Sequence, residues 1–333
     1  MNENAAPLMD LRGITKQFKK PLDLAEKIAN LLGGHNRAEV VHAVDDVSLT
    51  VAEGEVLGLV GETGCGKSTV GRIVADILEP TLGEVYYRGQ KRDDMTGATA
   101  KDSSLKVQMI FQDPYASLNP RMRVKEIIGE APRVHNIVSS AELDDYIDDV
   151  MDTCGLDPGF KRRFAHQFSG GQRQRIGIAR ALAVKPDFLV CDEAVAALDV
   201  SIQAQILNLF MTLREDLKLT YLFISHDLGV VEHMSDRVFI MYLGRIVETA
   251  PSDDLFKEPN HPYTQALLAE VPRVDSRRLE FTPVKGEIPS PLDPPTGCHF
   301  HPRCPHATER CRTEAPALKP IAPGRASACH LNE

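Results

Sequence analysis

Apolar and polar residues alternate between Val41 and Val60, and the stretch ends in the unbroken apolar run Val56–Val60. Alternation is typical of a half-buried strand, and a short apolar run is typical of a strand buried on both faces. Gly54 separates the two parts as a turn, and glycines follow Val60. The pattern therefore predicts a strand, a turn, a buried strand and a glycine-rich loop.

Strands and helices are predicted to alternate along most of the remaining chain, which indicates a mostly parallel sheet covered by helices. For one helix, Ser139 and Glu142 fit a capping box, and Gly155 stands where the helix should end. A basic, poorly periodic insertion over 19–40 is expected to form a loop with one or two helical turns. The expected strands cover residues 11–18, 105–111, 188–191 and 221–225, and the expected helices cover residues 68–78, 139–156, 171–184 and 201–218.

Composition and charge exclude several classes of protein. The chain has 333 residues, enough for two or three domains with a buried core. Its 38 Lys+Arg against 47 Asp+Glu give a net charge of −9, which argues against a protein that coats nucleic acid. No apolar run reaches membrane-spanning length and the start lacks the pattern of a signal peptide, so a cytoplasmic location is expected.

The stretch from Gly61 to Thr69 fits a phosphate-binding loop, because it follows a predicted buried strand and opens a predicted helix. Glycines let backbone N–H groups turn toward phosphates, Lys67 reaches the β- and γ-phosphates, and Ser68 ligates Mg²⁺. The alternative is a glycine-rich turn that matches by chance. The predicted nucleotide-binding residues here are Gly61, Gly64, Cys65, Gly66, Lys67, Ser68 and Thr69.

The apolar stretch Phe188–Cys191 is followed by two acids, Asp192 and Glu193. Two acids after a strand usually form a solvated turn, but in a chain with a phosphate loop they are expected beside that loop. Asp192 is predicted to hold Mg²⁺ and Glu193 to act as the general base that polarises the attacking water.

Between these two motifs lies Phe168-Ser-Gly-Gly-Gln-Arg-Gln174, which resembles the signature motif of ABC ATPases. The resemblance covers roughly residues 8–270. It implies that two cassettes pack head to tail, and that one cassette's signature motif grips the γ-phosphate of ATP held by the other. The signature residues concerned are Ser169, Gly170, Gly171 and Gln172.

Four further positions match the family. Gln112 corresponds to the glutamine that senses Mg²⁺ and contacts the permease, Asp199 to the loop crossing the dimer interface, and His226 to the histidine contacting the γ-phosphate. Phe18 is the candidate aromatic that stacks on adenine, with a role in the core as the alternative. The implied cofactors are ATP and Mg²⁺.

The implied fold class is α/β: a P-loop NTPase of the ABC cassette type, with a RecA-like parallel-sheet core, an antiparallel β part and a helical subdomain. Beyond Pro272 the chain is rich in Pro, Cys and His with little periodicity, so a small Cys-rich C-terminal extension without a large apolar core is expected. The expected parts are a nucleotide-binding core at 1–111 and 171–272, a glutamine loop with helical subdomain at 112–170, and the extension at 273–333.

The segment after Glu193 departs from the family pattern, because Ala194 and Ala196 stand where the family usually has a proline and then a serine or threonine. Loss of the proline loosens the backbone, and loss of the hydroxyl removes a hydrogen bond worth about 0.5–1.5 kcal/mol. Reduced but real hydrolysis is expected.

Two segments, Phe111–Arg121 and Asn260–Leu268, resemble the ATP-binding subunits of oligopeptide and dipeptide importers, whose relatives also import nickel or glutathione. The resemblance implies a second cassette, a paralogue rather than a second copy, two membrane permease subunits and an extracytoplasmic substrate-binding protein. It places the chain peripherally on the cytoplasmic face of the cell membrane, and nucleic acid is not an expected partner. The alternatives are a regulatory cassette that hydrolyses weakly, or an ABC protein acting on nucleic acid or ribosomes.

Four of the seven cysteines lie within the last 36 residues, spaced C-x5-C-x6-C-x17-C. An odd number of cysteines in a long chain fits reduced thiols or metal ligands. A structural [4Fe–4S] cluster, which similar importer subunits carry, is the favoured hypothesis, with zinc or no metal left open. The predicted ligands are Cys298, Cys304, Cys311 and Cys329.

Overall fold

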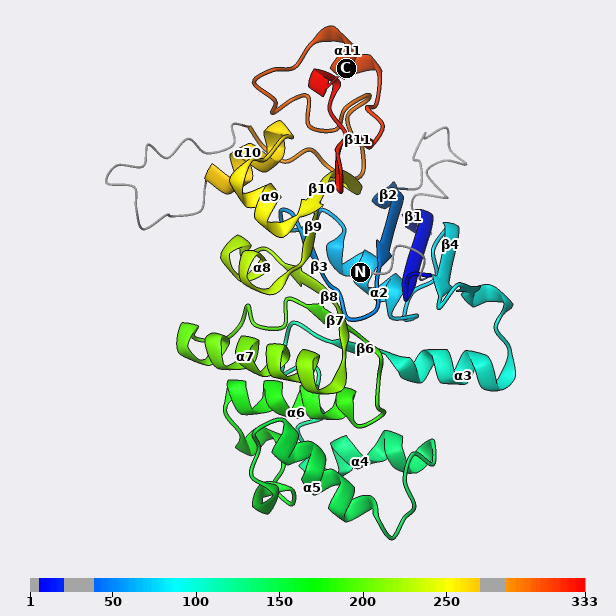
Figure 1. Ribbon diagram of the computed structural model, residues 1–333, viewed down its shortest axis with the longest axis vertical. Helices are drawn as coiled ribbons and strands as arrows, with labels where there is room; N and C mark the ends of the chain where they lie inside the picture. The colour runs from blue at the N-terminus through cyan, green and yellow to red at the C-terminus, as the bar shows by residue number, and fades with distance from the viewer. Residues whose placement is uncertain (1–5, 21–38, 270–285, 333) are drawn as a thin grey trace, which may run out of the picture.

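The computed structural model describes residues 6–20, 39–269 and 286–332, which form two sheets with helices around them (Figure 1). The larger sheet has the strand order β11-β12-β10-β9-β3-β8-β7-β6, and the smaller has the order β2-β1-β4-β5. Most of the insertion predicted over 19–40 lies outside the described residues.

The centre of the larger sheet is parallel, as the alternation of strands and helices predicts. Strand β3 (Val56–Val60) pairs with β8 (Thr220–Ser225) and β9 (Arg237–Tyr242), and β7 (Phe188–Asp192) lies between β8 and β6 (Val107–Ile110). Every residue of β3, β7 and β8 is buried. Since parallel strands present their carboxyl ends at one edge, the loops after β3, β6, β7 and β8 meet there.

The smaller sheet is antiparallel where β1 (Met9–Lys20) pairs with β2 (Glu39–Val51) and with β4 (Leu82–Tyr87). Its last strand is β5 (Gln90–Lys91). Helix α2 (Lys67–Val74) packs between the two sheets, and its apolar side chains join those of both in one core. This helix stops short of the predicted residue 78 because Asp76 adopts a left-handed backbone conformation, with φ +59°.

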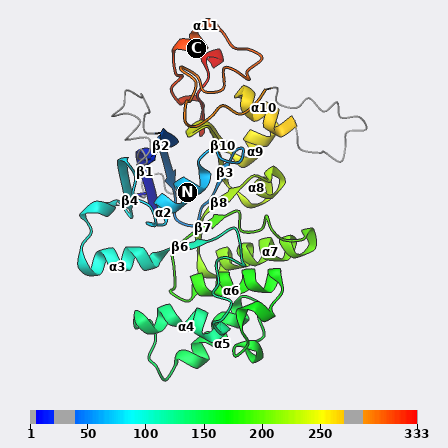
Figure 2. The same cartoon turned by 180° about the vertical axis from the view of Figure 1, so that it is seen from behind.

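Helices α4 (Val124–Val134) and α5 (Leu143–Thr153) pack against α6 (Gly170–Leu182) at one end of the molecule (Figures 1 and 2). The predicted helix over 139–156 begins later, at Leu143, because Ser139 and Glu142 bond to each other in the turn before it. Its end at Gly155, with φ +66°, is as predicted.

The C-terminal residues extend the larger sheet at the end opposite α4 and α5 (Figure 1). Strand β10 (Arg245–Pro251) pairs antiparallel with β9 and with β12 (Arg325–Ser327), and β11 (Lys319–Ala322) forms the edge. Phe300, 1% exposed, packs its ring against Tyr242 and Tyr263. Strand pairing and this small aromatic cluster hold the segment on the core, and its irregular sequence pattern gave no signal of either.

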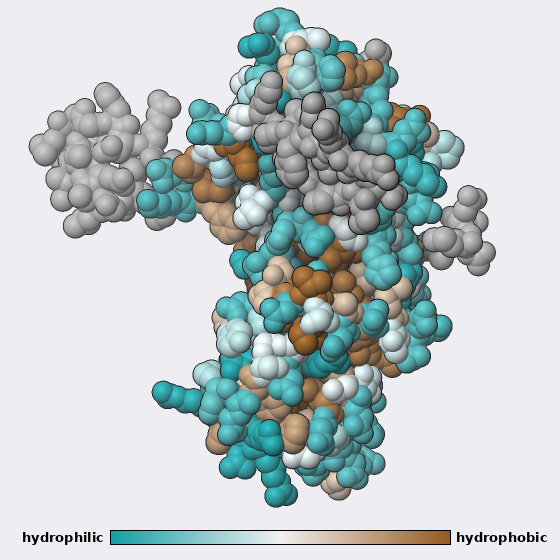
Figure 3. Space-filling view, turned by 90° about the vertical axis from the view of Figure 1, so that its left-hand side faces the viewer, coloured by the Kyte–Doolittle hydropathy of each residue, from teal (hydrophilic) through white to brown (hydrophobic). Residues whose placement is uncertain are grey.

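The remaining helices flank these elements, and the face in Figure 3 shows polar residues over both ends of the molecule. Among the described residues, no helix has both the length and the apolar character needed to cross a membrane. The bounds are α3 (Gly97–Lys106), α7 (Val200–Leu217), α8 (Leu228–Met234), α9 (Ser252–Lys257), α10 (Pro262–Ala269) and α11 (Glu309–Thr313), with 3-10 turns at Arg92–Asp94, Pro158–Phe160, Ala165–Gln167 and His330–Asn332.

Candidate functional site

The glycine loop between β3 and α2 curls tightly against its neighbours. A Cβ atom on Gly66 would lie 2.1 Å from the carbonyl oxygen of Ala43, and one on Gly61 would lie 2.1 Å from that of Met241. Gly64 and Gly66 also have positive φ angles, +82° and +111°, which L side chains rarely adopt. The loop therefore needs glycine at these positions to bring its backbone N–H groups around a phosphate.

Lys67 begins α2 and folds back over the loop. Its side chain is buried, and Nζ donates to the carbonyl oxygens of Gly61 (2.7 Å) and Glu62 (3.0 Å). A lysine ammonium held by carbonyl oxygens of the loop offers positive charge to the outer phosphates of a nucleotide.

Ser68 and Asp192 meet where α2 begins and β7 ends. The Ser68 hydroxyl donates to Asp192 Oδ1 over 2.9 Å. Burial raises the pKa of Asp192, and the adjacent Glu193 carboxylate adds to that effect, while the Ser68 hydrogen bond opposes it. A serine hydroxyl beside a desolvated carboxylate fits Mg²⁺, which takes one or two protein ligands and fills the rest with water and phosphate oxygens.

Glu193 is held between two side chains that come from different loops. Gln112, after β6, donates from Nε2 to Glu193 Oε2 over 2.6 Å, and His226, after β8, places Nδ1 3.3 Å from Glu193 Oε1. Glu193 itself has φ +48°, a left-handed conformation that is uncommon outside glycine and that clusters at functional sites. The three side chains predicted from separate motifs are therefore brought together.

A cavity of about 230 Å³ opens over the phosphate loop. It brings together Lys67, Ser68, Gln112 and Glu193 as predicted, and Phe18 is not among its lining residues. Phe18 is 42% exposed, and its cross-strand partner Val41 lines the cavity instead, so adenine stacking on Phe18 stays a prediction. The full lining is Val41, Ala43, Thr63, Gly64, Gly66, Lys67, Ser68, Thr69, Gln112, Glu193 and Pro291.

Two contributions to this cavity were missed from the sequence. Val41 and Ala43 belong to β2 and reach the loop through the pairing of the small sheet. Pro291 comes from the C-terminal segment, where its carbonyl oxygen accepts a hydrogen bond of 2.9 Å from the backbone N–H of His42. Neither an alternating strand nor an isolated proline carries a local signal for a nucleotide site.

The signature motif caps helix α6 and does not line the cavity. Ser169 is the N-cap: its hydroxyl accepts from the backbone N–H of Gln172 at 3.4 Å, and the Gln172 side chain accepts from the Ser169 N–H at 3.1 Å. Gly171 lets α6 approach α7, because a Cβ there would lie 2.4 Å from Ile202 Cγ2. Asp199, exposed, is the N-cap of α7. A helix N-terminus that does not line the chain's own phosphate-loop cavity suits an anion supplied by another molecule.

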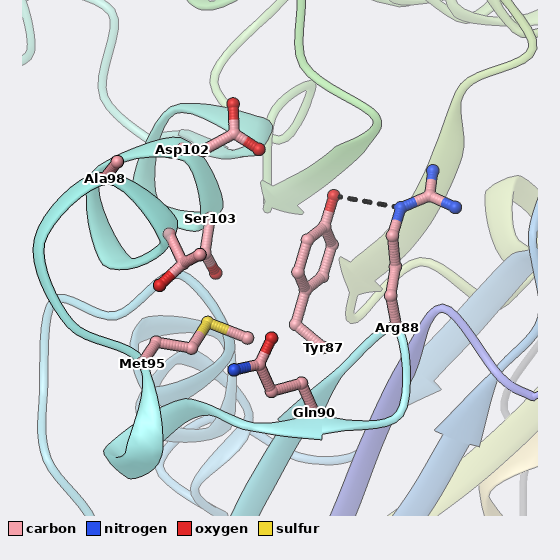
Figure 4. Close-up of a pocket in the computed structure, with 8 residues that line it drawn as sticks. Tyr87, Arg88, Gln90, Met95, Ala98, Asp102 and Ser103 are labelled. Atoms are coloured by element: carbon pink, nitrogen blue, oxygen red, sulfur yellow. Dashed lines mark hydrogen bonds between the residues drawn. The ribbon is translucent and has the colours of Figure 1, made fainter.

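A larger cavity of about 410 Å³ lies away from the phosphate loop, between β4 and α3 (Figure 4). Tyr87 and Arg88 line one wall (Figure 4). Both donate to the Asp187 carboxylate, over 2.9 and 3.0 Å. Burial raises the pKa of Tyr87 to about 12. This network ties β4 to the residue that precedes β7 and has a structural explanation.

The four C-terminal cysteines are free thiols, with no disulfide among the described cysteines. Burial raises the pKa of Cys298 to about 11, and the charges of the other three thiols add to the effect. Thiol chemistry fits an iron–sulfur cluster or zinc. However, no group of three or more Cys, His, Asp or Glu within the described ranges stands close enough to hold a metal ion, so the predicted cluster is not confirmed.

Known proteins are similar to this chain in sequence and in fold. A family model described as "ABC transporter" matches residues 44–196, and one described as "Oligopeptide/dipeptide transporter, C-terminal region" matches residues 247–311. The oligopeptide transport ATP-binding protein AppF of Bacillus subtilis is 46% identical over 332 residues, 98% of each chain. The putative oligopeptide transport ATP-binding protein YkfD of the same organism is 49% identical over 299 residues, 89% of this chain and 91% of its own.

Solved structures agree in fold. The ATP-binding cassette MJ0796, in a dimeric post-hydrolysis state with ADP and Pi, is 26% identical with a TM-score of 0.61, over 73% of this chain and 98% of that one. CbiO1 from Clostridium perfringens, 22% identical with a TM-score of 0.62, covers 76% of this chain and 92% of its own.

The fold and the phosphate-loop site together define an ATP-binding cassette. Its relatives share nearly half of their residues with it along nearly their whole length. The chain therefore belongs to the family of ATP-binding proteins of oligopeptide and peptide ABC transporters.

Proposed function

We propose that the chain hydrolyses ATP to power the import of oligopeptides or dipeptides through a membrane permease. One observation supports ATP hydrolysis most strongly: the Glu193 carboxylate is held between Gln112 and His226. Glu193 directly follows Asp192, which accepts the hydrogen bond from Ser68. The peptide part is supported by the names of the relatives and by the C-terminal family model.

The side chains divide the chemistry between holding ATP and activating water. The loop N–H groups and Lys67 bind the outer phosphates, and Glu193 accepts the proton of the attacking water as general base. Gln112 and His226 orient Glu193 through their contacts with its two carboxylate oxygens. Ser68, Asp192 and Gln112 would hold Mg²⁺, which neutralises charge on the phosphate oxygens when bound. Catalysis here is positioning and electrostatic stabilisation.

The working site is composite. The N-terminus of α6, with Ser169, Gly170, Gly171 and Gln172, faces a nucleotide held by a second cassette, and Asp199 lies at the same interface. ATP then acts as the bridge that closes the two cassettes, and hydrolysis lets them reopen. We expect a paralogous cassette as the partner, with two permease subunits, an extracytoplasmic binding protein and a position on the cytoplasmic face of the membrane.

A regulatory cassette that binds ATP and hydrolyses it weakly is the second candidate. One observation favours it: Ala194 and Ala196 follow Glu193 in place of a residue that fixes the backbone and one that carries a hydroxyl. The intact contacts of Glu193 favour hydrolysis.

We infer that the C-terminal thiols bind an iron–sulfur cluster with a structural role. Burial raises the pKa of Cys298, Cys304 and Cys329, and the charges of neighbouring thiols add to that effect. The proposal is supported by these reduced cysteines on one segment, since thiolates are the usual ligands of iron–sulfur clusters. Iron and acid-labile sulfide are measured on anaerobically purified protein. About four irons per chain are expected, and one zinc without iron contradicts the inference.

The experiment for the transport function uses proteoliposomes that contain the chain, its partner cassette, both permeases and the binding protein. ATP-dependent uptake of a labelled tripeptide or dipeptide is expected, with ATP turnover that rises when peptide is added. Uptake of nickel or glutathione with no competition by peptides would reassign the substrate. ATP turnover that never depends on the permeases would contradict a role in transport.

A further inference from the structure

The C-terminal segment reaches the phosphate loop through Arg303. Its guanidinium donates from Nη1 to Glu62 Oε2 at 2.7 Å and from Nη2 to Glu62 Oε1 at 2.9 Å, a bidentate pair between residues 241 positions apart. The Arg303 side chain is 4% exposed and that of Glu62 is 21% exposed. Glu62 follows Gly61 inside the loop, so a residue far along the chain fixes the first turn of the loop.

A second contact fixes the backbone at the same point. The N–H of Glu62 donates to the Tyr263 hydroxyl at 3.0 Å, and Tyr263 is fully buried against Tyr242 and Phe300. Arg303 also donates to the Tyr242 hydroxyl at 3.4 Å. Since Phe300 and Arg303 lie on the same turn, the aromatic cluster that holds the segment on the core also aims Arg303 at Glu62.

The Arg303–Glu62 ion pair compensates a negative charge inside the phosphate loop. Glu62 is a carboxylate in the same loop whose N–H groups and lysine receive the phosphates, and its carbonyl oxygen accepts a hydrogen bond from Lys67. An unpaired carboxylate there would repel a triphosphate and compete for the lysine. A bidentate guanidinium holds that carboxylate with its charge compensated and its direction fixed.

We propose that Arg303 is a positioning residue of the nucleotide site, which neutralises and orients Glu62 so that affinity for ATP depends on the C-terminal segment being in place. The same segment supplies Pro291 to the wall of the nucleotide cavity, so it meets the site at two points. The proposal rests on the assignment of residues 61–69 as the ATP-binding loop.

The test measures the dissociation constant of Mg·ATP for the purified full-length chain. Replacement Arg303→Met removes the charge but keeps the length of the side chain, and about tenfold weaker binding is expected from the exposed carboxylate. The double variant Glu62→Gln/Arg303→Met removes both charges and should return the constant to within about threefold of the original. Arg312→Met, an exposed arginine of the same segment, is the matched control and should change nothing.

A merely structural role for Arg303 predicts a different pattern. If the arginine only stabilised the fold, the double variant would bind ATP no better than the single one, and that result overturns the proposal. In the assembled transporter, Arg303→Met should raise the KM for ATP with kcat within about twofold, because the carboxylate acts on ground state and transition state alike.

Further outcomes separate a failure of this proposal from a failure of the loop assignment. If Arg303→Met does not fold, Arg303→Lys takes its place: about threefold weaker binding supports the proposal, since one ammonium cannot replace the fork, and unchanged binding overturns it. If the original chain binds no Mg·ATP, the assignment of the loop fails together with the proposal. Suppose instead that the original chain binds Mg·ATP, that Lys67→Ala abolishes this binding, and that Arg303→Met leaves it unchanged. In that case only the proposed role of Arg303 fails.

Discussion

Gln112 donates a hydrogen bond of 2.6 Å to Glu193, although the two residues lie on different loops, 81 positions apart. Gln112 follows β6 and Glu193 follows β7, and the parallel pairing of these two strands brings the loops together. The same glutamine lines the nucleotide cavity, so a single side chain connects the site of water activation to the loop that leads into α4. Movement of that loop would therefore change the position of the Glu193 carboxylate.

Replacement Gln112→Ala should lower kcat for ATP hydrolysis by about tenfold or more, because Glu193 loses the group that orients one of its oxygens. Steady-state turnover of the assembled transporter measures it. Gln108→Ala is the matched control, since among the described residues that side chain bonds only to the carbonyl oxygens of Ser104 and Leu105. Equal turnover in the two variants would show that the contact with Glu193 has no role in hydrolysis.

Replacement Gly171→Ala should lower the free energy of unfolding by about 1–3 kcal/mol, because the new methyl group collides with Ile202. Urea titration followed by circular dichroism measures it. Gly177→Ala is the control on the same helix: nothing lies within 4 Å of that position, so a gain of about 0.5–1 kcal/mol is expected. If Ile202→Ala does not relieve the loss at Gly171, the close approach of α6 and α7 is not its cause.

The paired replacement Ala194→Pro/Ala196→Ser should raise ATP turnover, by about threefold if one hydrogen bond of ordinary strength is regained. The backbone N–H of Ala194 has no carbonyl partner among the described residues, so proline costs no hydrogen bond there. Turnover of the assembled transporter with and without the change decides the point. An unchanged rate would mean that the two alanines are neutral.

His261 makes stability depend on pH. Burial lowers its pKa to about 4, against an ordinary value of 6.5. As the pH falls from 6.5 toward 4, the unfolded chain takes up a proton that the folded chain refuses, so the free energy of unfolding falls through that window. For this residue alone the fall amounts to about 3 kcal/mol.

Urea unfolding at several pH values measures this dependence. His261→Asn should flatten it, since asparagine keeps an acceptor for the N–H of Tyr263 but does not titrate. His166→Asn, at an exposed position, is the control and should keep the full slope. Equal slopes in the two variants would show that His261 does not control the acid sensitivity.

The parts of the site that could be predicted are those with local signals. A buried strand entering glycines fixes the phosphate loop and places Lys67 and Ser68, and an apolar run before two acids fixes Asp192 and Glu193. Ser169 was found through the resemblance of its motif to the ABC signature, and its cap on α6 is formed within four residues.

The parts that could not be predicted depend on contacts between distant residues. Arg303 and Glu62 are 241 positions apart, and the sequence around each residue contains no motif that predicts its partner. Pro291 lines the cavity and bonds to the backbone of β2, and Val41 lines it from the same strand, opposite Phe18. Local pattern cannot report such pairings.

The role of Glu193 as general base is tested most directly by a single-turnover experiment on the chain with its partner cassette. Labelled ATP is bound, and its cleavage at this chain's site is followed by chemical quench in the original protein and in Glu193→Gln. Cleavage should slow by about 100-fold or more, because the amide accepts no proton. ATP affinity should stay within about threefold, because Lys67 and the loop N–H groups still bind the phosphates. Cleavage at the original rate in Glu193→Gln would contradict the assignment of Glu193 as the base.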